Sequence, residues 1–266
     1  MISVIIIGSG NVAYHLFKTL SDNVQINVIQ WFSRSLRNIQ EYQPIVSMTN
    51  NIAELKDADI YIIAVSDDAI VQLSQELPFE NRFVVHTSGS VGIHDLDKKL
   101  RRGVFYPLQT FSKDVEIDFN NVPLCLEAIE KKDLALLIDL ANAIGAPYYK
   151  INTEQRQTLH LAAVFVNNFT NQMYRIGHEI SDIKNINFDI LKPLILETAK
   201  KVQSISPYMS QTGPAIRDDK KSIKRHLKLL ENPMHKDIYE LLTKSIKLTH
   251  GASKALNHPK LNHNND

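Results

Sequence analysis

The sequence predicts an α/β domain built on a parallel β-sheet, followed by a second domain that contains only helices. Three observations support this prediction. Short runs rich in β-branched residues alternate with helical stretches over the first half of the chain, and the first run ends at a glycine-rich turn that opens a helix. After about residue 151 these runs stop, and helical spacing of apolar residues continues towards the end. We therefore expect one domain over residues 1–151 and a helical domain over residues 152–266.

The expected strands are short and largely apolar, which is typical of parallel strands covered by helices on both faces. The run at residues 60–65 is the clearest example because it contains no charged residue. Helices are expected between the strands, since parallel neighbours need a crossover connection. In chain order we expect strands at residues 2–7, 24–32, 60–65, 83–85, 103–106, 124–126 and 148–150, and helices at residues 11–20, 67–77 and 132–144.

The second domain is expected to contain long helices separated by short turns. Asn232 before Pro233 is an N-cap and first-turn pair, and Gly251 supplies a C-terminal stop. The polar tail from Asn257 is expected to fray. We expect the helices at residues 154–180, 188–203, 219–230 and 233–250.

Composition argues against several classes of function. The 266 residues include 30 basic and 29 acidic side chains. The formal charge of +1 therefore provides no excess of positive charge to attract nucleic acid or an anionic membrane. The longest apolar runs have six residues, far below the roughly 20 that cross a bilayer. The single cysteine, Cys125, can form no intrachain disulfide and suits a reducing cytoplasm. We therefore expect a cytoplasmic protein with a small-molecule substrate, no nucleic-acid or membrane partner and no metal site.

The first turn has a pattern that binds phosphates. Residues 8–13 read G-S-G-N-V-A, which is G-x-G-x-x-A between a strand and a helix. The first glycine permits the tight turn, the second lets the backbone approach a pyrophosphate, and the small third position lets the helix pack on the strand. The helix N-terminus adds unpaired N–H groups and the positive end of its dipole. This context predicts a Rossmann-type dinucleotide site; a glycine turn that only packs strand against helix is the alternative.

The residues after the second expected strand favour NADP over NAD. NAD-binding sheets normally carry an acidic residue there for the ribose, but residues 28–40 contain no Asp or Glu. The segment contains Ser33, Arg34 and Ser35 instead. A guanidinium flanked by hydroxyls suits the extra 2′-phosphate of NADP, whereas the alternative is a solvated loop arginine.

Four further segments carry a family resemblance. They are A-V-S-D-D-A-I at residues 64–70, H-T-S-G-S at 86–90, F-Y-P-L-Q-T-F at 105–111 and T-G-P-A-I-R at 212–217. With the glycine turn, they make the chain resemble NADP oxidoreductases that have a Rossmann-like N-terminal domain and a helical C-terminal domain of unknown function. That family is distantly similar to pyrroline-5-carboxylate reductase, deazaflavin-dependent NADP oxidoreductase and the β-hydroxyacid dehydrogenases. The resemblance covers nearly the full length and implies the cofactor and the fold, but no substrate.

Two positions depart from the family pattern. Tyr106 stands where histidine often precedes Pro-Leu-Gln, and Asp218 follows Arg217 where glycine is common. These two loops are therefore expected to bind a somewhat different ligand.

The resemblance to β-hydroxyacid dehydrogenases implies a reaction centre. Ser88 with Gly89 resembles their substrate-holding Ser-Gly pair. Their first long helix of the second domain carries a lysine acid/base and an asparagine that orients the substrate; here the lysine position is the apolar Val164, and the asparagine matches Asn168. His160 lies on the same i, i+4, i+8 stripe, and its imidazole could deliver a proton near physiological pH. A histidine that only caps the domain interface is the alternative.

The sequence thus predicts an NADP-dependent oxidoreductase that transfers a hydride between the nicotinamide and a small carbonyl or imine, and that forms a homodimer through its helical domain. A catalytically silent NADP-binding sensor or scaffold, and a reductase of a deazaflavin or flavin partner, are the alternatives. Residues that follow the strands are expected to flank the nicotinamide, although His86 could instead be a strand-end histidine bonded to backbone. The expected catalytic residues are His160, Asn168 and Ser88, and the expected cofactor-binding residues are Gly8, Ser9, Gly10, Asn11, Val12, Ser33, Arg34, Ser35, Val65, Ser66, Asp67 and His86.

Overall fold

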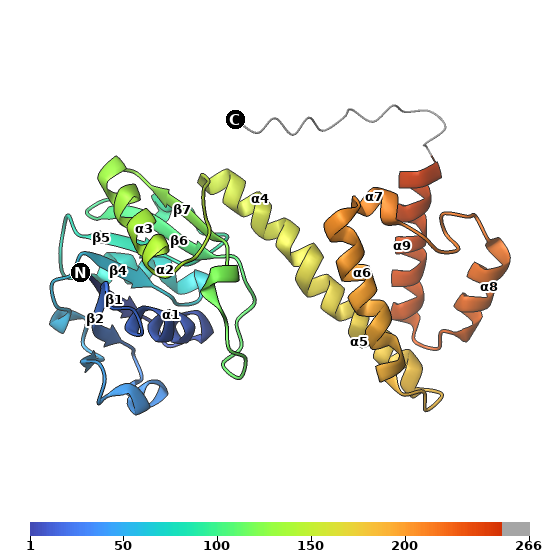
Figure 1. Cartoon of the computed structure of the whole chain (residues 1–266), viewed down its shortest axis with the longest axis horizontal. Coiled ribbons are helices and arrows are strands. Elements are labelled where there is room, and N and C mark those ends of the chain that lie inside the picture. The colour runs from blue at the N-terminus through green and yellow to red at the C-terminus, as the bar shows by residue number, and fades with distance from the viewer. Residues whose placement is uncertain (252–266) are drawn as a thin grey trace. The chain divides into compact units, whose positions relative to one another are not determined.

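A computed structural model of the chain describes residues 1–251 (Figure 1). The fraying expected from Asn257 onwards lies outside these described residues. Within them, one eight-stranded sheet has the order β3-β2-β1-β4-β5-β6-β7-β8. Its strands are β1 (Ile2–Ile7), β2 (Ile26–Phe32), β3 (Met48–Thr49), β4 (Ile60–Ile63), β5 (Phe83–His86), β6 (Arg101–Pro107), β7 (Leu124–Ala128) and β8 (Tyr148–Lys150).

The sheet confirms the predicted Rossmann-type α/β class, with one departure. Neighbouring strands are parallel from β3 to β6 and again between β7 and β8, but β6 and β7 are antiparallel. Strand order reverses between β1 and β4, which is the place where such sheets bind ligands at their carboxyl ends.

Helices cover both faces of the sheet. α1 (Asn11–Ser21) and α3 (Lys131–Ala143) pack on one face, and α2 (Asp67–Glu76) packs on the other. Alternate residues of β1 therefore enter different cores: Val4 and Ile6 pack with α1, whereas Ile5 and Ile7 pack with α2. Because both faces are covered, the strands need continuous apolar runs rather than an alternating pattern.

The chain after β8 is mainly helical. α4 (Thr153–Ala163) continues through a π-helical segment, Val164–Phe169, into α5 (Thr170–Asp182), so the helix expected at residues 154–180 forms with a π-helical middle. Such segments are frequent at functional sites. No helix in the described range is both long and apolar enough to cross a membrane. The later helices are α6 (Lys192–Ser204), α7 (Pro207–Ser210), α8 (Lys220–Leu229) and α9 (Pro233–Gly251).

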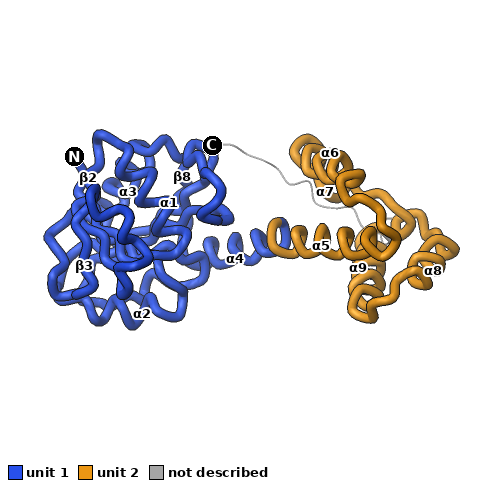
Figure 2. The backbone as a smooth tube through the Cα atoms, turned by 90° about the horizontal axis from the view of Figure 1, so that it is seen from below, with its two compact units in different colours: residues 1–166 blue, residues 167–266 orange. Residues whose placement is uncertain are grey.

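The chain forms two compact units, one over Met1–Val166 and one from Asn167 onwards (Figure 2). α4 thus belongs to the sheet unit, although the strand-like runs of β-branched residues end near residue 151. Fully buried Arg156 of α4 accounts for this, because its guanidinium pairs with Glu127 of β7 and donates to the carbonyl oxygen of Val91. The domain boundary at residue 151 stays a prediction.

Candidate functional site

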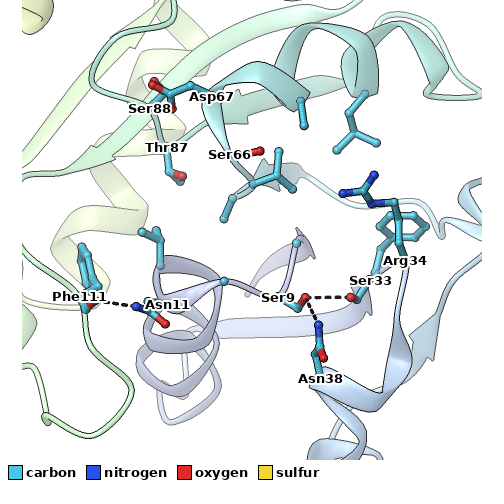
Figure 3. Close-up of a pocket in the computed structure, with 18 of the residues that line it drawn as sticks. Ser9, Asn11, Ser33, Arg34, Asn38, Ser66, Asp67, Thr87, Ser88 and Phe111 are labelled. Atoms are coloured by element: carbon cyan, nitrogen blue, oxygen red, sulfur yellow. Dashed lines mark hydrogen bonds between the residues drawn. The ribbon is translucent and has the colours of Figure 1, made fainter.

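A cavity of about 750 Å³ lies at the carboxyl ends of the strands in the sheet unit (Figure 3). The segments that follow β1, β2, β4, β5 and β6 all contribute to its walls, and α4 contributes His160. The lining includes every expected cofactor-binding residue except His86, together with Ser88. Residues far apart in sequence are brought together here because parallel strands place their carboxyl ends at one edge of the sheet.

The turn after β1 is fixed by contacts with the ends of the neighbouring strands β2 and β4. Gly8 has φ +130°, a conformation that side chains rarely adopt, and a Cβ there would lie 2.1 Å from the carbonyl oxygen of Ala64. Its N–H donates to the Phe32 carbonyl oxygen at 2.9 Å, and Trp31 Nε1 donates to the Gly8 carbonyl oxygen at 2.6 Å. Gly8 is therefore glycine for structural reasons, and the turn is fixed before any ligand binds.

Gly10 is glycine for a different reason. Its backbone has φ −77° and ψ −177°, which any residue adopts, and a Cβ would meet no atom within 4 Å. Neither strain nor packing requires glycine, so the space in front of Gly10 is left for something that approaches the backbone. Gly10 is also the N-cap of α1 and supplies no side-chain cap, so the first N–H groups of that helix lie free beside the cavity. Such a helix end binds anionic groups.

The segment after β2 forms a second wall of the cavity. Arg34 is exposed, and Figure 3 shows its guanidinium directed towards the open space. The Ser33 hydroxyl is buried and donates to Ser9 Oγ at 3.0 Å, and Asn38 Nδ2 donates to the same oxygen at 3.3 Å. Ser33 thus braces the phosphate-binding turn, which leaves Arg34 and Ser35 as the groups free to meet a ligand.

The other predicted cofactor residues lie on two helix starts. Val65, Ser66 and Asp67 line the cavity where α2 begins. Asn11 lines it from α1, but its side-chain amide donates to the carbonyl oxygen of Phe111 at 2.8 Å. Asn11 therefore ties the loop after β6 over the first turn of α1 (Figure 3).

Ser88 is arranged to donate a hydrogen bond. Its Oγ accepts the N–H groups of Ser90 and Val91, each at 3.0 Å, and so uses the acceptor positions of the hydroxyl. The hydroxyl hydrogen is left for a partner in the cavity that Ser88 lines. Such a donor matches a carbonyl oxygen or an imine nitrogen.

His86 does not reach the cavity, in contrast to the expectation that it binds the cofactor. It is fully buried, and its Nδ1 accepts the Ser88 N–H at 3.2 Å. Burial, and secondarily the charge of Arg156, lowers the pKa of His86 to about 3, so the imidazole is neutral at physiological pH. His86 therefore shapes the turn that carries Ser88.

His160 lies beside the same turn. Its Nδ1 lies 3.0 Å from the hydroxyl oxygen of Tyr106, and its ring packs on Gly89. α4 is fixed in register one turn earlier by Arg156, and Gln157 Nε2 donates to the Ser90 carbonyl oxygen at 2.6 Å. Asn168 lies in the part of the π-helical segment that belongs to the helical unit, and its expected contact with a substrate stays a prediction.

Several lining residues were not among the expected cofactor-binding or catalytic residues. The segment 105–111 contains polar and aromatic residues at the end of a strand and just beyond it, which is a usable signal. Asn38 instead ends a three-residue 3₁₀ helix, Leu36–Asn38, which is too short to give a sequence signal. α2 also presents one side to the cavity. The additional lining residues are Phe32, Asn38, Ala64, Ala69, Gln72, Leu73, Glu76, Thr87, Gly89, Tyr106, Gln109 and Phe111.

The sheet topology and the cavity define a dinucleotide-binding α/β protein with an appended helical unit. Residues 122–246 match the family model called domain of unknown function DUF2520. A "putative NADP oxidoreductase" of Bacteroides fragilis is 39% identical, with a TM-score of 0.84, and the match covers 94% of this chain and 98% of that one. The chain belongs to the same family as that protein, which confirms the resemblance noted in its motifs.

More distant structures share the fold. A protein of Thermotoga maritima has 19% identity and a TM-score of 0.71 over 94% of this chain and 99% of its own. An imine reductase of Myxococcus stipitatus, solved with NADP⁺, has 14% identity and a TM-score of 0.63 over 95% of this chain and 94% of its own. No curated protein matches the chain.

Proposed function

We propose that this protein is an NADP-dependent oxidoreductase that transfers a hydride between the nicotinamide and a small carbonyl or imine. One observation carries the proposal: a single cavity joins an anion-binding end, formed by Gly10 and Arg34, to a hydrogen-bonding end, formed by Ser88 and His160. Its volume of about 750 Å³ is within the range of sites for cofactors and small molecules. The "putative NADP oxidoreductase" of Bacteroides fragilis, which belongs to the same family, supports the choice of cofactor.

The residues present suit this dinucleotide. The bare backbone at Gly10 leaves room that a Cβ would fill, and Arg34 has no carboxylate partner among the described residues. When bound, the nicotinamide supplies the hydride chemistry. The chain holds the phosphates on α1, offers Ser88 as a hydrogen-bond donor to the substrate, and presents His160 as the group that delivers a proton.

A screen of NADPH oxidation tests the proposal and its two alternatives. Keto acids, cyclic imines and deazaflavins are the substrates to compare. Turnover with a carbonyl or imine, lost in the His160→Ala variant, supports the proposed reaction. An absorbance change of an added deazaflavin or flavin favours the flavin-partner alternative, and NADPH binding without any turnover favours the sensor or scaffold. The proposal includes a cytoplasmic location, which the single, buried Cys125 supports.

Arg34→Ala is expected to weaken NADP binding by about one to two orders of magnitude and to leave NAD binding nearly unchanged. The reason is that a hydrogen bond to a charged group contributes roughly 1.5–3 kcal/mol, and the 2′-phosphate is present only in NADP. Titration calorimetry with both dinucleotides measures the effect. Arg37→Ala is the matched control, because Arg37 is an exposed neighbour that does not line the cavity. Equal affinity of the unmodified protein for NAD and NADP would contradict this assignment.

The proposal also includes a homodimer formed through the helical unit. Among the described residues of that unit, Ile176 and Ala215 are the buried apolar ones, whereas Leu194 is 61% and Leu241 68% exposed. A unit that buries so little apolar surface is not stable alone, and exposed patches of this kind mark interfaces. A second copy of the chain offers the same apolar faces and would cover them.

Sedimentation velocity is expected to give a dimer for the unmodified protein and a monomer for the Leu194→Glu/Leu241→Glu double variant. Glutamate at these positions would place charges in an apolar interface, where desolvation is costly. A monomer at tens of micromolar concentration for the unmodified protein would exclude the dimer.

A further inference from the structure

Tyr106 and Gly89 both contact His160 within the sheet unit. The Tyr106 hydroxyl oxygen lies 3.0 Å from His160 Nδ1, and the two rings meet edge to face with centroids 5.9 Å apart. A Cβ built on Gly89 would lie 2.6 Å from both Cγ and Nδ1 of His160. The Cγ–Nδ1 edge of the imidazole is therefore enclosed by these two residues.

The glycine at position 89 is needed for His160 and not for the backbone. Its φ lies outside the left-handed region, so another residue could adopt this conformation. The atoms that a side chain would meet are those of the His160 ring and its Cβ, all at less than 3.0 Å. Real Cβ contacts are not this short, so an alanine at position 89 would displace the ring from its present place.

Tyr106 carries a hydroxyl hydrogen that it can donate to His160 Nδ1, 3.0 Å from its oxygen. Burial raises the pKa of its hydroxyl to about 12, so the phenol keeps its proton at neutral pH. With a phenolic donor at Nδ1, the neutral imidazole carries its own hydrogen on Nε2. None of the described residues gives His160 Nε2 a hydrogen-bond partner, and His160 lines the cavity.

We propose that Tyr106 and Gly89 are positioning residues that fix the ring placement and the tautomer of His160, so that Nε2–H is the group offered to a ligand in the cavity. Gly89 leaves the space for the ring, and Tyr106 donates to Nδ1. The inference rests on the proposed function for what His160 acts upon, but on these contacts alone for how His160 is held. In the protonated imidazole, Nδ1–H donates to the Tyr106 oxygen instead. Transfer of the Nε2 proton to a substrate then leaves a neutral ring with its hydrogen on Nδ1, and this ring takes up its next proton from water at Nε2.

Nitrogen NMR of the full-length protein labelled with ¹⁵N-histidine tests the proposal without any substrate. The signals of His160 are assigned by their loss in His160→Ala. We expect an Nε2–H tautomer in the unmodified protein at neutral pH, and loss of this tautomer preference in Tyr106→Phe, which keeps the ring and removes the hydroxyl. Gly89→Ala is expected to produce the same change, because its Cβ would displace the ring from the position in which Nδ1 meets the Tyr106 hydroxyl.

A second tyrosine–histidine pair supplies the matched control. His226 Nδ1 lies 2.8 Å from the Tyr239 hydroxyl oxygen in the helical unit. Tyr239→Phe should alter the His226 signals and leave those of His160 unchanged. An Nδ1–H tautomer of His160 in the unmodified protein, or unchanged His160 signals in folded Tyr106→Phe, overturns the proposal.

Kinetics provide an independent measurement once a substrate is found. Tyr106→Phe should lower kcat about tenfold, the change that one neutral hydrogen bond carries, while KM and NADPH affinity stay the same. A raised KM with unchanged kcat would instead assign Tyr106 to substrate binding and overturn the positioning role. If no substrate is turned over, the NMR experiment still tests the positioning of His160, because it needs no substrate. Failure of the proposed function is therefore distinguishable from failure of this inference.

Discussion

Gly10→Val is expected to abolish dinucleotide binding while leaving the protein folded. The backbone of Gly10 has dihedral angles open to valine, and a Cβ there meets no protein atom within 4 Å. The side chain would instead occupy the space in front of the free N–H groups of α1, where a pyrophosphate must approach the backbone. Thermal unfolding with and without NADPH measures both properties in one experiment.

The size of the expected effect follows from linkage. A ligand at about 100 times its dissociation constant stabilises the native state by roughly 2.7 kcal/mol, and this stabilisation disappears when binding is lost. The unmodified protein should therefore melt at a higher temperature with NADPH, and Gly10→Val should not. Normal NADPH stabilisation in Gly10→Val would mean that the turn only packs the strand against the helix.

Gly8→Ala is the informative comparison for this experiment. Gly8 has φ +130°, and its Cβ would lie 2.1 Å from the Ala64 carbonyl oxygen, so alanine there strains the fold itself. Substitutions of the two glycines should therefore have different effects. Gly8→Ala lowers the melting temperature without ligand, whereas Gly10→Val changes only the response to NADPH. This difference is visible in the contacts and not in the motif.

Much of the fold could be predicted because it depends on local composition. The buried strand β4 (Ile60–Ile63) lies within the apolar run predicted at residues 60–65, and α1 begins at Asn11 as the glycine turn requires. β3 (Met48–Thr49) was missed because two residues carry no periodic signal. The antiparallel direction of β7 could not be predicted either, since apolar composition does not encode the direction in which a strand runs.

The candidate site was predictable where a motif fixes the backbone, and less so where a contact joins distant segments. The glycine turn and Arg34 follow from their position after β1 and β2. The contact between Tyr106 and His160 joins residues 54 positions apart, and it depends on α4 packing on the sheet through buried Arg156. The burial of His86 likewise depends on tertiary packing, because a strand-end histidine can face either the core or the cavity.

His160→Ala is expected to lower kcat by about 10²–10⁴-fold, which is the usual contribution of a proton-transfer group, and to leave NADPH affinity nearly unchanged. The imidazole lines the cavity beside Ser88, whereas the phosphate-binding turn and Arg34 are formed by other segments, so the loss of the ring should not disturb the cofactor. Single-turnover kinetics with NADPH and the substrate found by screening measure the chemical step directly.

His226→Ala is the matched control for His160→Ala, because it removes another histidine that contacts a tyrosine but lies in the helical unit. It should retain full activity. The distinction between a proton donor and a group that only packs on Gly89 comes from His160→Gln, whose amide can still donate a hydrogen bond but cannot transfer a proton. If His160 delivers the proton, His160→Gln is as slow as His160→Ala. Full activity in His160→Ala would remove His160 from the mechanism and leave Ser88 or a water molecule as the proton source, because His86 is buried away from the cavity.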